Sequence, residues 1–196
     1  MSAWPDLLGP AEAVAPRLLG AVISHGPVAV RITEVEAYAG SRDPGSHAAR
    51  GPTPRAAVMF GPAGHLYCYV SYGMHTCANV VVGHDGEAAG VLLRAGEVVA
   101  GHDVARERRP GVAESQLARG PGLLCRALGI SVDLRGTDLA EGPVRLELPA
   151  TPVADVVSGP RVGLRLAAQR PWRFWIADDP TVSDYRRHPK ASDGRP

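Results

Sequence analysis

Two glutamates and a tyrosine stand at alternate positions at the end of an apolar stretch. The stretch begins at Val28, and its alternation continues through Glu34, Glu36 and Tyr38. Residues two apart in a β-strand point to the same side, so the pattern predicts both carboxylates on the face that is apolar further back. We expect at least one at the mouth of a cavity, where a carboxylate can act as a general base on water. The alternative for either glutamate alone is a solvated charge at a strand end.

An arginine in a second apolar stretch offers the partner that such a base needs. Arg94 lies within Val-Leu-Leu-Arg-Ala at 91–95, and a buried arginine nearly always has a partner. It could hold the attacking water beside a carboxylate. Chemistry that runs through a lysine amine is disfavoured, because Lys190 is the only lysine among 21 basic residues.

Tyrosine is concentrated in one part of the chain. Four of the five tyrosines (38, 67, 69 and 72) fall within 35 residues, near His47 and a Gly- and Pro-rich loop at 40–64. Tyrosine has an apolar face and a polar edge, and nucleobases stack on such walls. The pattern favours a pocket for a flat ligand. The alternative is aromatic packing in a small core, although phenylalanine would serve there and the chain has only two.

Histidines and cysteines beside these tyrosines make only a weak metal motif. Alternation places His65 and Cys68 on opposite faces of one strand, which is wrong for shared ligation. The pair His75 and Cys77 adds no recognised metal spacing, and the cysteines are more typical of small buried apolar residues. The chain also lacks a phosphate-binding loop, a dinucleotide-binding Gly-x-Gly-x-x-Gly and a Gly-x-Ser-x-Gly elbow. We therefore predict no metal and no cofactor.

The elements that must position these residues follow from hydrophobic periodicity and from Gly and Pro. A strand is predicted at 28–38 and a hairpin at 66–71 and 76–82, with residues 72–75 at its tip. Further strands are predicted at 90–95, 144–148 and 173–176, and a helix at 123–129 with a glycine stop. The first 20 residues indicate two short helical pieces, and 101–120 a helix followed by a loop. We expect one mixed domain over 1–187 and a flexible tail at 188–196.

The composition fits one soluble globular domain. Of the 196 residues, 45% are apolar and 21% are charged. No membrane span and no signal peptide are expected, so a cytoplasmic protein is predicted. Three cysteines argue against a disulfide framework. A net charge of +1 means that a nucleic-acid partner must be met by a local basic patch.

Six separate blocks of the sequence together carry a resemblance to one known family. They are Ile-Thr-Glu-Val-Glu-Ala-Tyr at 32–38, Asp43 to His47, Tyr-x-Tyr-x-x-Tyr-Gly-Met-x-x-Cys-x-Asn at 67–79, Val-Leu-Leu-Arg-Ala at 91–95, Gly-Pro-x-x-Leu-Cys at 120–125 and Arg-Val-Gly at 161–163. In this order and spacing, over roughly residues 15–187, the chain resembles the alkyladenine (3-methyladenine) DNA glycosylases. The resemblance implies a single α/β (α+β) domain with a curved antiparallel sheet, flanking helices and a protruding β-hairpin.

The resemblance also implies an activity. Proteins of this family act in base excision repair: they flip alkylated or deaminated purines out of duplex DNA and hydrolyse the N-glycosidic bond. Glu36 matches the general base for the attacking water, and Arg94 matches the residue that helps to position this water. We expect a monofunctional glycosylase, a monomer that acts on double-stranded DNA with a damaged purine, at the nucleoid.

The family's base pocket maps onto the tyrosine-rich region. Tyr38, His47 and Tyr69 match its walls, and Asn79 matches the floor residue that discourages guanine through its exocyclic amine. Tyr72, at the hairpin tip, matches the side chain that enters the minor groove and fills the gap in the stack. An exposed aromatic side chain at a hairpin tip independently suggests such a wedge.

One position departs from the family pattern. Leu123 stands where family members carry a lysine, which removes one phosphate or helix-start contact. DNA affinity is then expected to depend on about half of Arg50, Arg55, Arg106, Arg108, Arg109 and Arg119.

Two alternative functions stay open: a non-catalytic nucleic-acid-binding module with the same fold and a small-molecule hydrolase with an aromatic pocket. The second does not explain an exposed tyrosine at the tip.

Overall fold

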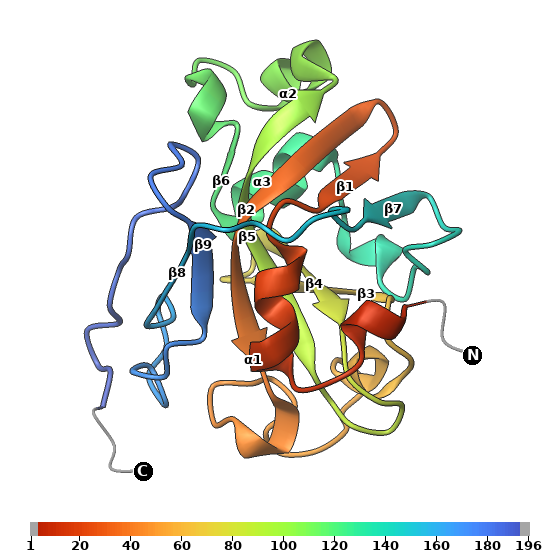
Figure 1. The fold of residues 1–196 in the computed structure, drawn as a ribbon, viewed down its shortest axis with the longest axis vertical. Helices are drawn as coiled ribbons and strands as arrows, with labels where there is room; N and C mark the ends of the chain where they lie inside the picture. Colours follow the sequence, from red (N-terminus) through yellow and green to blue (C-terminus); the bar gives the residue numbers. More distant parts are fainter. Residues whose placement is uncertain (1–3, 193–196) are drawn as a thin grey trace.

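A computed structural model describes residues 4–192, and within them nine strands form one curled antiparallel sheet (Figure 1). The main path runs β3-β4-β5-β2-β1-β7, with β6 on β5, β9 on β2 and β8 on β9. The strands are β1 (Val22–His25), β2 (Val28–Tyr38), β3 (Leu66–Ser71), β4 (His75–Val81), β5 (Gly90–Ala100), β6 (Ala118–Arg119), β7 (Val144–Glu147), β8 (Val156–Gly159) and β9 (Arg173–Ile176). A curled sheet with a few helices confirms the predicted mixed fold.

Short helices fill the connections. The α-helices are α1 (Ala11–Val14), α2 (His102–Arg108) and α3 (Pro121–Leu128), and 3-10 helices occupy Pro5–Leu7, Ala15–Leu18, Gly40–Arg42, Ala57–Phe60, Glu114–Gln116 and Val132–Leu134. The predicted glycine stop of α3 is confirmed, because Gly129 follows the helix with a φ of +72°. None of the helices within residues 4–192 is long and apolar enough to cross a membrane.

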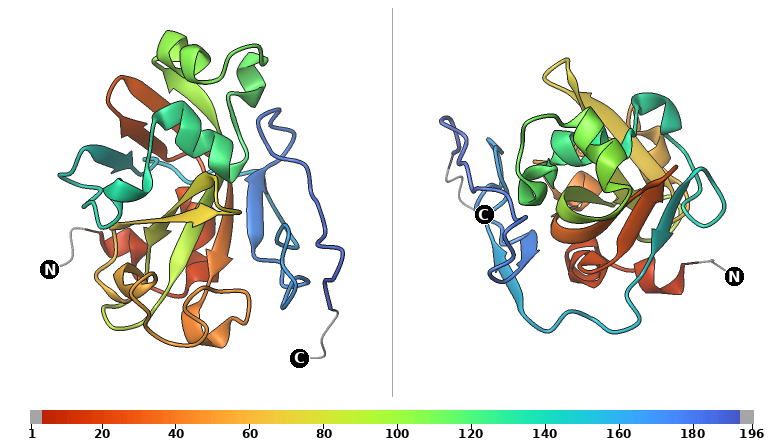
Figure 2. Two further views of the ribbon diagram at one scale, coloured as in Figure 1. Left: turned by 180° about the vertical axis from the view of Figure 1, so that it is seen from behind. Right: turned by 90° about the horizontal axis from the view of Figure 1, so that it is seen from above.

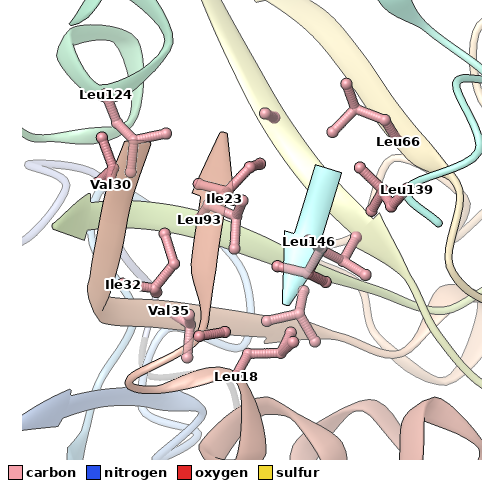
Figure 3. Close-up of a cluster of buried hydrophobic side chains, with 14 of the residues drawn as sticks. Leu18, Ile23, Val30, Ile32, Val35, Leu66, Leu93, Leu124, Leu139 and Leu146 are labelled. Carbon is pink, nitrogen blue, oxygen red and sulfur yellow. The ribbon is translucent and has the colours of Figure 1, made fainter. Parts of the chain in front are cut away.

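The core lies between the sheet and the helices on its two sides. Figure 3 shows side chains from the strands meeting Leu124 of α3 and Leu18 of the second 3-10 helix. These core residues are fully buried or nearly so. The core fixes the position of β2 and β5, the two longest strands, whose far ends carry the site.

A bulge at Thr33, one of three register shifts in the β2–β5 pair, changes which side of β2 faces the core. Thr33 of β2 and Arg94 of β5 have no cross-strand partner in this pair, so each is an extra residue. Ile32 packs in the core before the bulge, and Val35 and Ala37 pack there after it. The prediction that the two glutamates share the face that is apolar further back is therefore wrong, because alternation changes phase at an extra residue.

The second half of β2 is held on both edges. Residues 34–38 pair with β5, and Glu34 to Glu36 also pair with β9. The strand predicted at 173–176 is β9, and it pairs with β2 at the two glutamates. Strands β1, β6 and β8 were not predicted; each is four residues or shorter, too short for an alternation to stand out.

The β3–β4 hairpin projects from the body of the protein (Figure 2, right). Its tip is formed by Tyr72, Gly73 and Met74, and the Met74 N–H donates to the Ser71 carbonyl at 3.1 Å. Tyr72 and Gly73 have φ values of +49° and +72°. Two successive residues with positive φ match the tight twist of a hairpin turn, and glycine is the residue that adopts this most readily.

The chain after β9 runs along one side of the sheet without strand or helix (Figures 1 and 2). It is anchored where Thr181 exchanges a buried hydroxyl hydrogen bond of 2.7 Å with Thr33. Nearer the end, the Ser192 N–H donates to the Arg165 carbonyl at 3.0 Å. The predicted tail begins within this segment, and its residues 193–196 lie outside the described part of the chain.

Candidate active site

A cleft opens between the end of β2, the 40–64 loop and the base of the hairpin. It is lined by Tyr38, Gly45, Ser46, His47, Met59, Tyr67, Tyr69, Asn79 and Leu164. An adjoining groove shares Tyr38, His47, Tyr69 and Leu164 with it and extends to Glu36, Tyr72 and Arg94. The structure therefore brings together all seven site residues that the sequence singled out.

The cleft walls are aromatic and interlocked. The rings of His47 and Tyr69 meet edge to face, with centroids 4.5 Å apart and planes at 88°. The Tyr67 hydroxyl lies 3.3 Å from Nδ1 of His47. Desolvation and the nearby Arg55 guanidinium lower the pKa of His47, which favours a neutral imidazole. The walls thus present neutral, electron-rich rings to a bound base.

Burial also keeps the tyrosine walls neutral. It raises the pKa of Tyr69 well above its ordinary value, and the neighbouring Cys77 thiol adds to this. Burial and then the Glu36 carboxylate raise the pKa of Tyr38. Both phenols therefore keep their protons and can donate hydrogen bonds.

Asn79 lies in the deep part of the cleft and is 4% exposed. It belongs to β4, where it pairs with Tyr67 on one side and Leu92 on the other. Its Nδ2 donates to the Tyr67 carbonyl at 3.1 Å. This bond fixes the orientation of the amide in the cleft wall.

Glu36 is fully buried at the junction of the cleft and the adjoining groove. Its Oε2 accepts a hydrogen bond from the Tyr38 hydroxyl at 2.8 Å, and its Oε1 accepts one from the Val162 N–H at 2.7 Å. NH1 of Arg94 stands 3.3 Å from the same Oε1. A carboxylate has about four acceptor positions, so one position on Oε2 remains for a further donor.

Arg94 and Glu34 form a second layer behind Glu36. Nε of Arg94 donates to Oε1 of Glu34 at 2.8 Å, and its NH2 donates to the Ser183 hydroxyl at 3.2 Å. Burial lowers the pKa of Arg94, but the two glutamates outweigh it and the net pKa is raised. Arg94 is therefore a permanent cation at the base of the groove.

A buried ion pair joins the 40–64 loop to the end of β2. Arg161 and Asp43 are both fully buried, and they meet through NH1 at 2.5 Å and NH2 at 2.8 Å. NH1 of Arg161 also donates to the Ala37 carbonyl at 2.9 Å. Its guanidinium lies over the rings of Tyr38 and Trp172, at 4.8 and 5.2 Å from their centroids. The pair thus holds one wall of the cleft in place.

Tyr72 stands apart from these buried groups. It is 87% exposed at the hairpin tip, and Met74 beside it is 70% exposed. Its ring lines the outer part of the groove rather than the cleft. This position suits a side chain that enters a partner molecule.

The arginines predicted to contact DNA differ in what they already bind. Arg106 pairs with Asp103 and Glu114, and the other three in this part of the chain donate to backbone carbonyls within the protein: Arg108, Arg109 and Arg119. Arg55 donates to the Val70 carbonyl in the hairpin. Arg50 lies exposed in the loop.

A basic groove lies on the other side of Arg94. Four arginines line it together with Leu123, the position predicted to depart from the family: Arg94, Arg109, Arg119 and Arg186. Arg186 was not among the predicted contacts, because nothing in the sequence near the C-terminus indicates that this segment returns to the site.

The cysteines are buried in the strands and in α3 rather than grouped with histidines. Burial raises the pKa of the Cys68 thiol to about 12, and Cys77 and Cys125 are also buried thiols. Among residues 4–192 no group of three or more His, Cys, Asp and Glu side chains could hold a metal ion.

Several supporting residues were missed by the sequence reasoning. Arg173 and Ser183 hold Glu34, and the Val162 N–H holds Glu36. Val162 lies in a block that pointed to the family, but its sequence position carries no sign of which atom it serves. Arg173 fell within a predicted strand, and an arginine in an apolar strand was the available signal.

The chain matches a known family model and many known proteins. The model for methylpurine-DNA glycosylase (MPG) matches residues 6–180. A protein of Cutibacterium acnes named "Putative 3-methyladenine DNA glycosylase" is 56% identical over 189 residues, which is 92% of this chain and 98% of that protein. Proteins of the same name from Nocardia farcinica and Corynebacterium glutamicum are 57% and 48% identical, over 89% and 94% of this chain and 87% and 98% of their own lengths.

Proposed function

Because this chain belongs to the methylpurine-DNA glycosylase family, we propose that it is a DNA repair enzyme that excises alkylated or deaminated purines from duplex DNA. The observation that carries the proposal is the Glu36 carboxylate, which is fully buried beside an aromatic cleft and keeps one acceptor position open. A non-catalytic module would have no use for a buried, charge-balanced carboxylate, which is costly to maintain.

The flipped base binds between the aromatic walls. Tyr38 and Tyr69 offer π-faces to the base, and an alkylated purine that carries positive charge gains from electron-rich rings. The neutral His47 adds no repulsion to such a base. Asn79, held by the Tyr67 carbonyl, discourages guanine through its exocyclic amine.

Water is the nucleophile in this proposal. A water molecule donates to the open position on Oε2 of Glu36, which takes its proton as the oxygen attacks the sugar carbon. The bond between this carbon and the purine nitrogen breaks, and the electron pair leaves with the base. Arg94 stabilises the arrangement of carboxylate and water through NH1. The purine departs readily when alkylation has already made its ring electron-poor.

The proposed enzyme is monofunctional and leaves an uncut strand with an abasic site. Strand cleavage through an imine needs an amine at the sugar. Lys190 is exposed in the C-terminal segment, where its backbone N–H donates to the His188 ring. It is absent from the residues that line the cleft and both grooves. The protein acts as a monomer on the DNA of the nucleoid, with Tyr72 as the wedge that replaces the flipped base.

Single-turnover cleavage tests the proposal. The substrates are duplexes with one hypoxanthine or one 1,N6-ethenoadenine, in EDTA. The wild type should produce alkali-labile abasic sites, and Glu36→Gln should cleave at least ~10²-fold more slowly while it still binds the lesion. Glu97→Gln is the matched control, since Glu97 pairs with the surface residue Arg31. Binding without cleavage by the wild type would support the module instead, and a borohydride-trapped covalent adduct would contradict the water route.

A further inference from the structure

Glu34 is buried as deeply as Glu36 but faces no substrate. It is fully buried, and it is absent from the residues that line the cleft and the adjoining groove. Its Oε1 accepts from Nε of Arg94 at 2.8 Å and from Nε of Arg173 at 2.6 Å, and its Oε2 accepts from the Ser183 N–H at 2.8 Å. A carboxylate held by three donors behind the site cannot serve as the base for water.

The contacts of Arg94 show what Glu34 achieves. Glu34 occupies the Nε edge of its guanidinium, and the Ser183 hydroxyl occupies NH2. NH1 is left to face Glu36, at 3.3 Å, which is longer than a charge-assisted hydrogen bond of about 2.8 Å. Glu34 and Ser183 therefore bind the opposite edge of the Arg94 guanidinium and keep it away from Glu36.

Arg173 and Ser183 brace this arrangement from the other side of β2. Arg173 is 4% exposed, and its NH2 donates to the Ser183 carbonyl at 2.7 Å. Its guanidinium also lies 4.5 Å from the ring centroid of Trp175. Because β9 pairs directly with β2 at these residues, the brace moves with the strand that carries both glutamates.

The charges of the cluster balance. Glu34 and Glu36 contribute two negative charges, and Arg94 and Arg173 contribute two positive charges. Without the charge of Glu34, two cations would face one buried anion. Arg94 would then be drawn into a direct, two-point contact with Glu36, and such a contact fills the acceptor position that the water needs.

We propose that Glu34 is a positioning residue: by holding Nε of Arg94, it keeps the guanidinium far enough from Glu36 to leave that carboxylate open to water. This inference rests on the proposed function for its catalytic consequence. It assigns a task to the cluster of Glu34, Arg173 and Ser183, none of which is among the described residues that line the aromatic cleft or the adjoining groove.

The test compares Glu34→Gln with Thr33→Val. Both changes alter a buried polar group of the same bulge, but Thr33 bonds only to Thr181 and not to the arginines. At a temperature where each variant is folded, Glu34→Gln should lower single-turnover cleavage about 10- to 100-fold, the cost of a misplaced catalytic group, with lesion affinity within threefold of wild type. Thr33→Val should cleave like the wild type. Cleavage by Glu34→Gln within threefold of wild type would overturn the proposal.

A double substitution separates positioning from a direct effect. If Glu34 acts through Arg94, then adding Glu34→Gln to Arg94→Ala should cost less than threefold beyond Arg94→Ala alone. Losses that multiply in full would show that Glu34 acts independently and would overturn the proposal.

A spectroscopic measurement tests the contact of Glu34 with Arg94 and Arg173 without a cleavage assay. In ¹⁵N–¹H spectra the Nε–H groups of Arg94 and Arg173 should give two exchange-protected signals that persist in Thr33→Val and are lost or shifted in Glu34→Gln. Unchanged signals in Glu34→Gln would overturn the proposal. A wild type that cleaves no lesion duplex would refute the proposed function, while these signals would still decide whether Glu34 holds the guanidinium.

Discussion

Replacing Tyr72 with glycine should make the protein more stable and its binding to a paired lesion weaker. The tyrosine has a φ of +49°, a conformation that costs a residue with a Cβ about 1–2 kcal/mol. Its ring is 87% exposed, so little packing is lost. Glycine adds about 0.5–1 kcal/mol of unfolded-chain entropy. The net gain is about 0.5–1 kcal/mol, or about 1–4 °C in melting temperature for a chain of this size.

The functional loss has the opposite sign. In the proposed mechanism the tyrosine ring replaces a base in the stack, and such aromatic stacking is worth about 1–3 kcal/mol. Affinity for a lesion in duplex DNA should therefore fall about 5- to 150-fold. A lesion in single-stranded DNA needs no replacement in the stack, so its affinity should change little.

The assay uses the Glu36→Gln background, so that binding is measured without cleavage. Thermal unfolding gives the stability, and titration of fluorescent duplex and single-stranded DNA, each with one ethenoadenine, gives the two affinities. Tyr72→Phe is the control, because it keeps the ring and the strained turn. A melting temperature that falls in Tyr72→Gly would refute the stability argument. Equal losses on both substrates would make Tyr72 a part of the pocket and not a wedge.

Two further predictions concern the buried charges. Asp43→Asn leaves the buried Arg161 without its counter-charge. Unfolding in urea should therefore show a free energy of unfolding that is lower by about 3 kcal/mol, and base binding should weaken. A decrease below about 1 kcal/mol would show that the pair does not hold the cleft wall. Burial raises the pKa of Glu34, but Arg94 and Arg173 outweigh this effect, so the pKa of Glu34 lies below the ordinary 4.5. The ionised Glu34 therefore stabilises the folded protein above pH 4.5. This stabilisation is lost as the pH falls through the lower pKa of the folded state. Glu34→Gln should therefore flatten the fall in stability below pH 4.5, and an unchanged slope would contradict the direction of this shift.

Much of the site could be predicted because its residues lie in short, locally recognisable segments. The strand at 28–38 has the predicted bounds, and the hairpin differs by one residue at each end of its second strand. Within these elements Glu36, Tyr38, Tyr69 and Asn79 line the cleft or the groove as expected. Local periodicity and turn residues determine such elements, so they can be read without knowledge of the fold.

The phase of β2 and the second layer of the site could not be predicted in this way. The bulges at Thr33 and Arg94 depend on how β2 and β5 pair, and a single strand gives no sign of its partner's register. Arg173 and Ser183 lie 139 and 149 residues beyond Glu34. Glu34 was predicted to be a second candidate for the base, and only its three distant donors show that it is a structural counter-ion.

The distance along the chain between Glu34 and its donors also bears on how the protein is made. Synthesis proceeds from the N-terminus, and contacts of large sequence separation form late. The strand with both glutamates and the hairpin with Tyr72 leave the ribosome long before Arg173 and Ser183. A chain that stops before residue 173 carries the exposed hairpin tip without the arginine and the backbone N–H that complete the cluster. Under the proposed role of Glu34, base excision therefore needs nearly the whole chain, and a prematurely terminated product lacks it.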